Sequence, residues 1–140
     1  MALAASLPAA AQFRNAEDAV EYRQSAFTVM GAHFGRIGAM VQGKAPYDAA
    51  AAAQNAEVVA FVSKLPYAGF VEGTSDTKKG SAKASIWTER AKFDAAAKKM
   101  QDEAAKLAVA AKSGGMDTLK PAFLAVAESC KACHDDYRNK

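Results

Sequence analysis

The chain has 140 residues, which is enough for one domain with a sizeable buried core. Its composition, 51% hydrophobic and 24% charged, is that of an ordinary globular protein, and no apolar run reaches the ~20 residues of a membrane span. The net charge of +3 is spread along the chain, whereas nucleic-acid-binding proteins gather Lys and Arg in one patch, so nucleic-acid binding gains no support. A slight positive balance still suits an encounter with an acidic partner protein.

The N-terminal segment differs from the rest of the chain. Residues 1–11 are small, apolar and uncharged, and they end in an alanine triplet of the A-x-A type, which is typical of the end of a secretory signal peptide whose basic start is missing here. We therefore expect residues 1–11 to be a residual signal peptide and residues 12–140 to form the domain. Export through the inner membrane of a bacterium would place this domain in the periplasm.

The chain after the signal segment shows a helical apolar period. Over residues 16–41, apolar side chains recur at spacings of three and four, Asn15 is suited to cap the N-terminus, and Arg23 is the one cation on the apolar stripe. An alanine-rich second helix follows the turn at residues 43–48, and Pro66 ends it.

The second half begins with the longest predicted loop. Residues 69–85 are rich in Gly, Ser, Thr and Lys and carry no apolar period, and a loop of this length is often a functional rim. A third helix, predicted to be unbroken over residues 86–111, ends at the Ser-Gly-Gly that follows. Asp117 is suited to cap a fourth helix, which tolerates Pro121 near its first turn and carries both cysteines of the chain on its apolar stripe.

Four amphipathic helices without strands predict an all-α fold, an antiparallel four-helix bundle. Such a bundle can bind a cofactor between facing helices. The alanines on the stripes of the second and third helices indicate either close helix approach or room for a group that is not protein.

Residues 129–138 read SCKACHDDYR and contain the only two cysteines of the chain, for which four uses are open. A disulfide between Cys130 and Cys133 would close a tiny loop and stabilise little. Tetrahedral zinc needs four ligands, and these cysteines with His134 and His33 would be an unusual set. A thioredoxin-like dithiol normally lies at the N-terminus of a helix that follows a strand, whereas this pair lies in the last turns of a helix.

The fourth use, covalent haem attachment, employs three residues at once. In C-x-x-C-H, each thiol adds to a vinyl group of the haem, and the histidine that follows becomes an axial ligand of the iron. Export also agrees with covalent haem attachment. The pattern therefore favours one haem c attached at Cys130 and Cys133, with His134 on the iron.

With this motif in view, the sequence resembles the cytochromes c prime, bacterial class II c-type cytochromes that are four-helix bundles with C-x-x-C-H near the C-terminus. The resemblance covers nearly the whole chain from Gln12. It is carried by QFRNAEDAVEYRQSAFTVMGAHFGR at the start, by QGKAPYDAA and LPYAGF in the middle, by IWTERAKF at the third helix and by ESCKACHDDYR at the end. The loop between Phe70 and Ser85 matches poorly, which suits a surface connection.

The resemblance implies roles around the iron. Cys130 and Cys133 would hold the haem, and His134 would be its proximal ligand. The other face of the iron would have no protein ligand and would be covered by Phe27, at a position where Leu is common. Arg138 would lie against the proximal side, one helical turn beyond the histidine.

The resemblance also implies roles at the haem edge. Arg23 and Gln24 would lie beside the propionates, which would give the cation on the apolar stripe its anion unless Arg23 extends to solvent. Lys83 and Ser85 would line the same edge, although the stretch departs from the Pro-acid pair that is usual in the family. Three nearby aromatic residues are interpreted as packing in the core or the haem pocket: Tyr67, Trp87 and Phe93.

The function that the resemblance implies is binding of nitric oxide and carbon monoxide at a five-coordinate, high-spin iron. Selectivity against dioxygen follows, because an apolar side chain at Phe27 offers dioxygen no hydrogen bond. Electron transfer with a redox partner protein stays open as a further role, and the alternative is a low-spin electron carrier with Met30 as sixth ligand. No catalytic constellation appears, so we do not expect an enzyme. A homodimer through the first two helices is also implied.

Overall fold

The computed structural model of the protein describes residues 12–140, and the predicted signal peptide, residues 1–11, lies outside the described residues. Within residues 12–140 the chain forms six helical segments and no β-strand. They are α1 (Ala16–Val41), α2 (Ala49–Val62), the 3-10 helix η2 (Pro66–Gly69), α3 (Ser85–Thr88), α4 (Arg90–Ser113) and α5 (Met116–Tyr137).

The first two helices begin at polar caps. Asn15 Oδ1 accepts a hydrogen bond from the main-chain N–H of Asp18 at 2.8 Å, and α1 then has the bounds that its apolar period predicts. Asp48 Oδ1 caps α2 in the same way, accepting from the N–H of Ala51 at 2.9 Å. Pro66 lies beyond the end of α2 and begins η2, where a missing N–H costs no helical hydrogen bond.

Two details of the later helices differ from the prediction. The predicted third helix is interrupted at Glu89, whose φ of −118° and ψ of 34° are not helical, so the short α3 precedes α4. The apolar period conceals this break because Ile86 and Phe93, on either side of it, are both buried. The residue before α5 is Gly115, with a φ of 71° that favours glycine, and Asp117 lies in the first turn instead of capping it.

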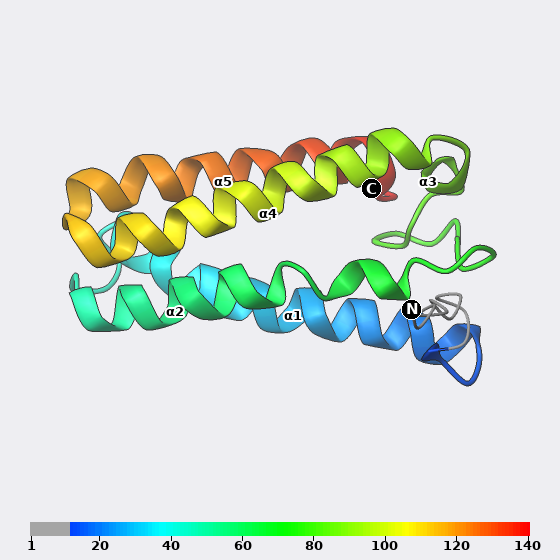
Figure 1. The fold of residues 1–140 in the computed structure, drawn as a ribbon, viewed down its shortest axis with the longest axis horizontal. Helices are drawn as coiled ribbons and strands as arrows, with labels where there is room; N and C mark the ends of the chain where they lie inside the picture. The colour runs from blue at the N-terminus through cyan, green and yellow to red at the C-terminus, as the bar shows by residue number, and fades with distance from the viewer. Residues whose placement is uncertain (1–11) are drawn as a thin grey trace, which may run out of the picture.

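The four long helices form an up-down-up-down bundle (Figure 1). In this view α1 and α2 form the lower pair and α4 and α5 the upper pair, with each helix running opposite to the one before it. Helix α4 packs against both α5 and α2, and α1 packs against α2 and η2. The predicted all-α four-helix bundle is therefore confirmed.

Protein side chains fill the end of the bundle where α1 turns into α2 and α4 into α5. Phe34 of α1 stacks on Phe123 of α5, with ring centroids 4.3 Å apart and planes 13° apart. The buried members of this core come from all four long helices: Ile37, Met40, Ala52, Ala56, Leu107, Ala111, Leu119, Phe123 and Val126. Protein side chains alone therefore form the core at this end of the bundle.

The long loop between η2 and α3, residues 70–84, is tied to the C-terminus at the other end of the bundle. The N–H of Gly80 donates to the carbonyl of Asn139 at 2.8 Å, and the N–H of Lys83 donates to the carbonyl of Tyr137 at 2.9 Å. We call this pairing the C-terminal clasp. It fixes the loop against the end of α5, although the loop has no regular secondary structure of its own.

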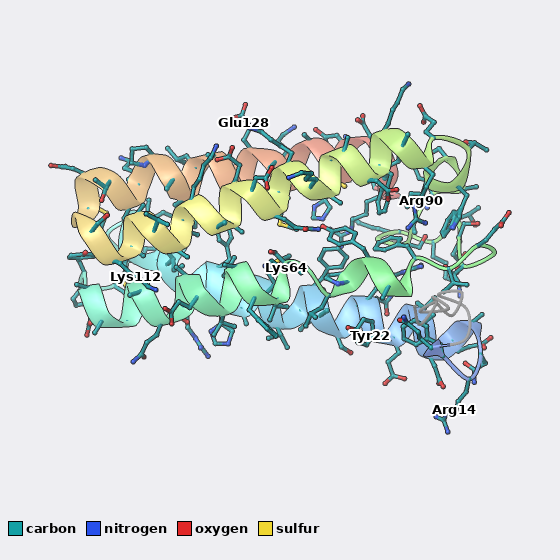
Figure 2. The ribbon with its side chains drawn as sticks, viewed as in Figure 1. Arg14, Tyr22, Lys64, Arg90, Lys112 and Glu128 are labelled. Atoms are coloured by element: carbon teal, nitrogen blue, oxygen red, sulfur yellow. The ribbon has the colours of Figure 1, made fainter. Side chains whose placement is uncertain are left out.

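Charged side chains cover the outside of the bundle. Figure 2 shows Arg14 and Glu128 directed away from the helices. Lys112, near the end of α4, forms an ion pair with Glu57 of α2 and so links the two helix pairs at the surface. Among the helices of residues 12–140, none combines the length and the apolar composition needed to cross a membrane.

Candidate cofactor site

A cavity of about 880 Å³ lies inside the bundle, at the end that holds the C-terminal clasp. Side chains from α1, α2, η2, the loop, α3, α4 and α5 line it, and most of the lining is apolar. This volume is in the upper part of the range of ligand-binding cavities. The alanine stripe of α2 does not make this room, because Ala52 and Ala56 are buried in the core of the opposite end, where the helices approach closely.

Both cysteines line the cavity from α5, where they lie one helical turn apart. They are free thiols and are partly buried. Burial raises the pKa of the Cys130 thiol, and burial together with the neighbouring Cys130 raises the pKa of the Cys133 thiol to about 11. A redox dithiol has a lowered thiol pKa, so the environment of this pair argues against that use.

His134 follows on the same helix and also lines the cavity. Burial lowers the pKa of its imidazole, and the positive charge of Arg138 lowers it further. A neutral imidazole has the free nitrogen lone pair that a metal requires. The helix thus presents two thiols and a metal-binding nitrogen to one cavity.

A zinc site made of side chains alone is not formed in the described part of the chain. No group of three or more His, Cys, Asp and Glu side chains there is arranged to hold a metal ion. His33 instead contacts Asn55, with 2.8 Å between Nδ1 of the imidazole and Oδ1 of the amide. A haem iron takes most of its ligands from the porphyrin and needs only an axial group such as His134 from the protein.

Aromatic rings form the wall of the cavity that faces α5. Phe27 of α1 meets Tyr67 and Phe70 edge-on, with ring centroids 6.3 Å and 6.2 Å apart. Phe93 of α4 continues the wall, with its ring centroid 4.8 Å from that of Phe70. The structure therefore places Phe27 in the lining of the same cavity as His134, within a cluster of aromatic rings.

Arg23 lies in the cavity lining and is 5% exposed, so its guanidinium does not extend to solvent. Its Nη1 donates to the carbonyl of Gly69 at 3.1 Å and to Thr74 Oγ1 at 2.6 Å, and its Nη2 donates to the carbonyl of Thr74 at 2.7 Å. The guanidinium also lies 4.6 Å from the ring centroid of Phe70. All these partners are neutral, and a buried cation is normally accompanied by an anion.

The other predicted edge residues divide into two groups. Gln24 and Arg138 line the cavity, although Arg138 lies just past the end of α5 and its Nε donates to the carbonyl of Gly80 at 3.2 Å. Lys83 and Ser85 are not in the lining. The C-terminal clasp holds the main chain of Lys83 against α5, and its Nζ donates to the carbonyl of Asp135 at 3.3 Å.

The sequence pattern missed several residues of the site. The loop supplies Asp76 and residues 78–82 to the lining, and its lack of any period gave no means of placing them. Met100 of α4 lines the cavity beside the expected Met30, although its position in the chain suggested packing. Tyr67, which was expected to pack in the core or the haem pocket, is in the lining.

These residues fit a haem. The cavity has apolar aromatic walls, two thiols three residues apart, an imidazole next to them, and a buried guanidinium that lacks an anion. The profile of the family described as Cytochrome C′ matches residues 18–138.

The chain belongs to the cytochrome c′ family. It is 49% identical to a cytochrome c′ from Alcaligenes xylosoxydans xylosoxydans over 129 residues, which is 92% of this chain and 99% of the relative. It is 45% identical to a cytochrome c′ from Rubrivivax gelatinosus, again over 92% of the chain and over 100% of that protein. The cofactor of the family is a covalent haem c, and the chain has the two cysteines that attachment requires.

Solved structures agree with this assignment. The cytochrome c′ of Shewanella frigidimarina superposes with a TM-score of 0.87 at 44% identity, covering 91% of this chain and 99% of that one. A nitric oxide complex of a mutant cytochrome c′ from Alcaligenes xylosoxidans superposes with a TM-score of 0.83 at 48% identity, covering 91% and 98%. The fold and the haem thus agree with the prediction from the CKACH motif.

Proposed function

We propose that this cytochrome c′ binds nitric oxide and carbon monoxide at a five-coordinate, high-spin haem iron and discriminates against dioxygen. Cys130 and Cys133 would hold the haem by two thioether bonds, and His134 would be the single axial ligand from the protein. Bound in this way, the haem supplies an iron with one open position. The protein would act by reversible binding and not by catalysis.

The composition of the wall opposite α5 is the observation that carries this proposal. No His, Cys, Asp or Glu from α1, α2, η2 or α4 lines the cavity. Phe27 lines the cavity from α1, so a ligand would have to displace an aromatic ring to reach the iron. The phenyl rings of this wall offer no hydrogen bond to dioxygen, which gains more than nitric oxide or carbon monoxide from a hydrogen-bond donor. A nitric oxide complex of a relative supports gas binding in the family.

Arg23 and Gln24 would face the haem propionates. The carboxylates would give the buried guanidinium the anion that the described residues do not provide, while Thr74 and Gly69 hold it in place. Arg138, fixed to the loop through Gly80, would keep a positive charge beside His134.

A low-spin electron carrier is the second candidate, because Met30 is 7% exposed, lines the cavity and lies one turn from Phe27. The absorption spectrum of the reduced holoprotein separates the two candidates. High-spin bands that change on addition of carbon monoxide are expected, whereas sharp low-spin bands that carbon monoxide leaves unchanged would refute the proposal and favour Met30 as a ligand.

Phe27→Ala tests the role of the ring directly. We expect the rate of carbon monoxide binding, measured by flash photolysis, to rise because the ligand no longer has to displace the ring. Val29→Ala is the matched control, since Val29 is on the same helix but is 45% exposed. Equal rates in Phe27→Ala and the wild type would show that the ring does not limit entry.

We also propose that the protein is a periplasmic homodimer whose subunits meet through α1 and α2. Tyr22 and Val29, seven residues apart on α1, are 38% and 45% exposed, and Phe61 of α2 is 69% exposed. Apolar groups of this size are commonly covered at an interface. Sedimentation of the wild type and of Phe61→Ser should show a dimer that the substitution weakens, and a wild-type monomer would contradict the proposal.

A further inference from the structure

Tyr67 is the polar member of the aromatic wall. It lies in η2, where Pro66 precedes it and its carbonyl accepts from the N–H of Phe70 at 3.1 Å. Its ring stacks on Phe70 at 6.0 Å between centroids, and it meets the rings of Phe27 and Phe93 edge-on at 6.3 Å and 6.0 Å. Three rings and a short helix therefore fix the direction of the phenol.

Tyr67 lines the cavity, and within residues 12–140 its hydroxyl has no hydrogen-bond partner. Burial raises the pKa of the Tyr67 phenol. The phenol is thus a neutral O–H group at physiological pH, and its proton is available for a hydrogen bond to a ligand that enters the cavity.

We infer that Tyr67 donates a hydrogen bond to a ligand bound in the cavity and thereby sets how far the haem discriminates among diatomic ligands. The inference rests on the proposed function, because it requires a ligand on the Phe27 side of the haem. Phe27 and Phe93 act on entry by their bulk, since neither has a polar atom in its side chain. Tyr67 belongs to the same wall but has a hydroxyl that can donate a hydrogen bond. The phenyl rings therefore affect how easily a ligand enters, and Tyr67 affects how strongly a polar ligand is bound.

The consequence concerns dioxygen above all. A donor stabilises the ligand that takes on the most negative charge, and among the diatomic ligands this is dioxygen. The apolar wall alone would predict strong discrimination against dioxygen, whereas the Tyr67 hydroxyl reduces that discrimination. A single oxygen atom in η2 would thus tune selectivity without changing the shape of the cavity.

Tyr67→Phe removes this oxygen atom and keeps the ring and its packing. The measurement is the infrared stretching band of carbon monoxide bound to the reduced holoprotein. We expect the band to move to higher wavenumber in Tyr67→Phe, because a donor near the ligand oxygen weakens the carbon–oxygen bond. The wild-type band should also shift slightly when the protein is transferred to deuterated water, and the variant band should not.

Tyr137→Phe is the matched control. Tyr137 also lines the cavity, but it does so from α5, where its ring lies edge-on to Phe93 with centroids 5.4 Å apart. Its substitution should leave the band in place. An unchanged band in Tyr67→Phe, or equal shifts in both variants, would overturn the inference while the proposed function stands. A wild-type holoprotein with no carbon monoxide band at all would overturn both.

Discussion

Gly69 is the position where the addition of one methyl group should do most harm. A Cβ built there would lie 2.5 Å from the main-chain oxygen of Ala19 and 2.9 Å from the Cβ of Arg23. Neither atom is at the end of a flexible side chain, so no rotamer change relieves the contact. To reach an ordinary contact of 3.4 Å from the oxygen, η2 and α1 must move apart by about 0.9 Å.

The cost of Gly69→Ala can be estimated from this movement. Overpacking of a well-packed contact costs ~1–3 kcal/mol, and a clash between two main-chain segments belongs at the upper end. The shift would also lengthen the hydrogen bond from Arg23 to the carbonyl of Gly69, which is worth about 1 kcal/mol. We therefore expect a loss of about 3 kcal/mol in the free energy of unfolding and a fall in melting temperature of about 10 °C.

Urea denaturation of the holoprotein, followed by far-UV circular dichroism, measures the effect. Two glycines of α1 calibrate it. A Cβ at Gly35 meets no atom within 4 Å, so Gly35→Ala should stabilise the helix by ~0.5–1 kcal/mol. A Cβ at Gly38 lies 3.0 Å from Cζ of Phe123, a side chain that can adjust. The change in the free energy of unfolding for Gly38→Ala should therefore lie between those for Gly35→Ala and Gly69→Ala. A Gly69→Ala protein as stable as the wild type would refute the reasoning.

Two further predictions concern α4. Glu103 accepts hydrogen bonds from Lys99 and Lys106. These bonds lower the pKa of the Glu103 carboxyl below its ordinary 4.5, and the bond from Lys99 has the larger effect. The charged carboxylate therefore stabilises the folded protein fully above pH 4.5, and this stabilisation is lost as the pH falls through the lowered pKa. Glu103→Gln should destabilise the protein at about pH 7 and have no effect in strong acid. A difference from the wild type that is independent of pH would contradict this. Leu107→Ala should cost ~2–5 kcal/mol in the same denaturation experiment because the side chain is 0% exposed, whereas Leu124→Ala, at 51% exposure, should cost under ~0.5 kcal/mol. Equal costs for the two leucines would contradict the proposed core.

Local chemistry explains which features could be predicted from the sequence. Asn15 and Pro66 act through the main chain within a few residues, so the ends of α1 and α2 follow from short-range rules. The CKACH motif works in the same way, because Cys130, Cys133 and His134 share one turn of one helix. The haem could therefore be predicted without the tertiary structure.

Contacts between distant segments explain the rest. Arg23 is held by residues about fifty positions later in the chain, and nothing in its own helix predicts Thr74 as a partner. The loop is positioned by the C-terminal clasp, so its residues could not be assigned to the cavity before the fold was known. Lys83 was predicted at the haem edge from its place before Ile86, but it is not in the lining, and its Nζ donates to the carbonyl of Asp135.

The C-terminal clasp holds one side of the cavity in place. Because the loop is bonded to the last residues of α5, it cannot swing open without breaking contacts to the helix that also carries His134. Loop motions take nanoseconds to microseconds, whereas side-chain rotations take picoseconds to nanoseconds. Under the proposed function, entry of a gas molecule would therefore depend on the rotation of the Phe27 ring and not on opening of the loop.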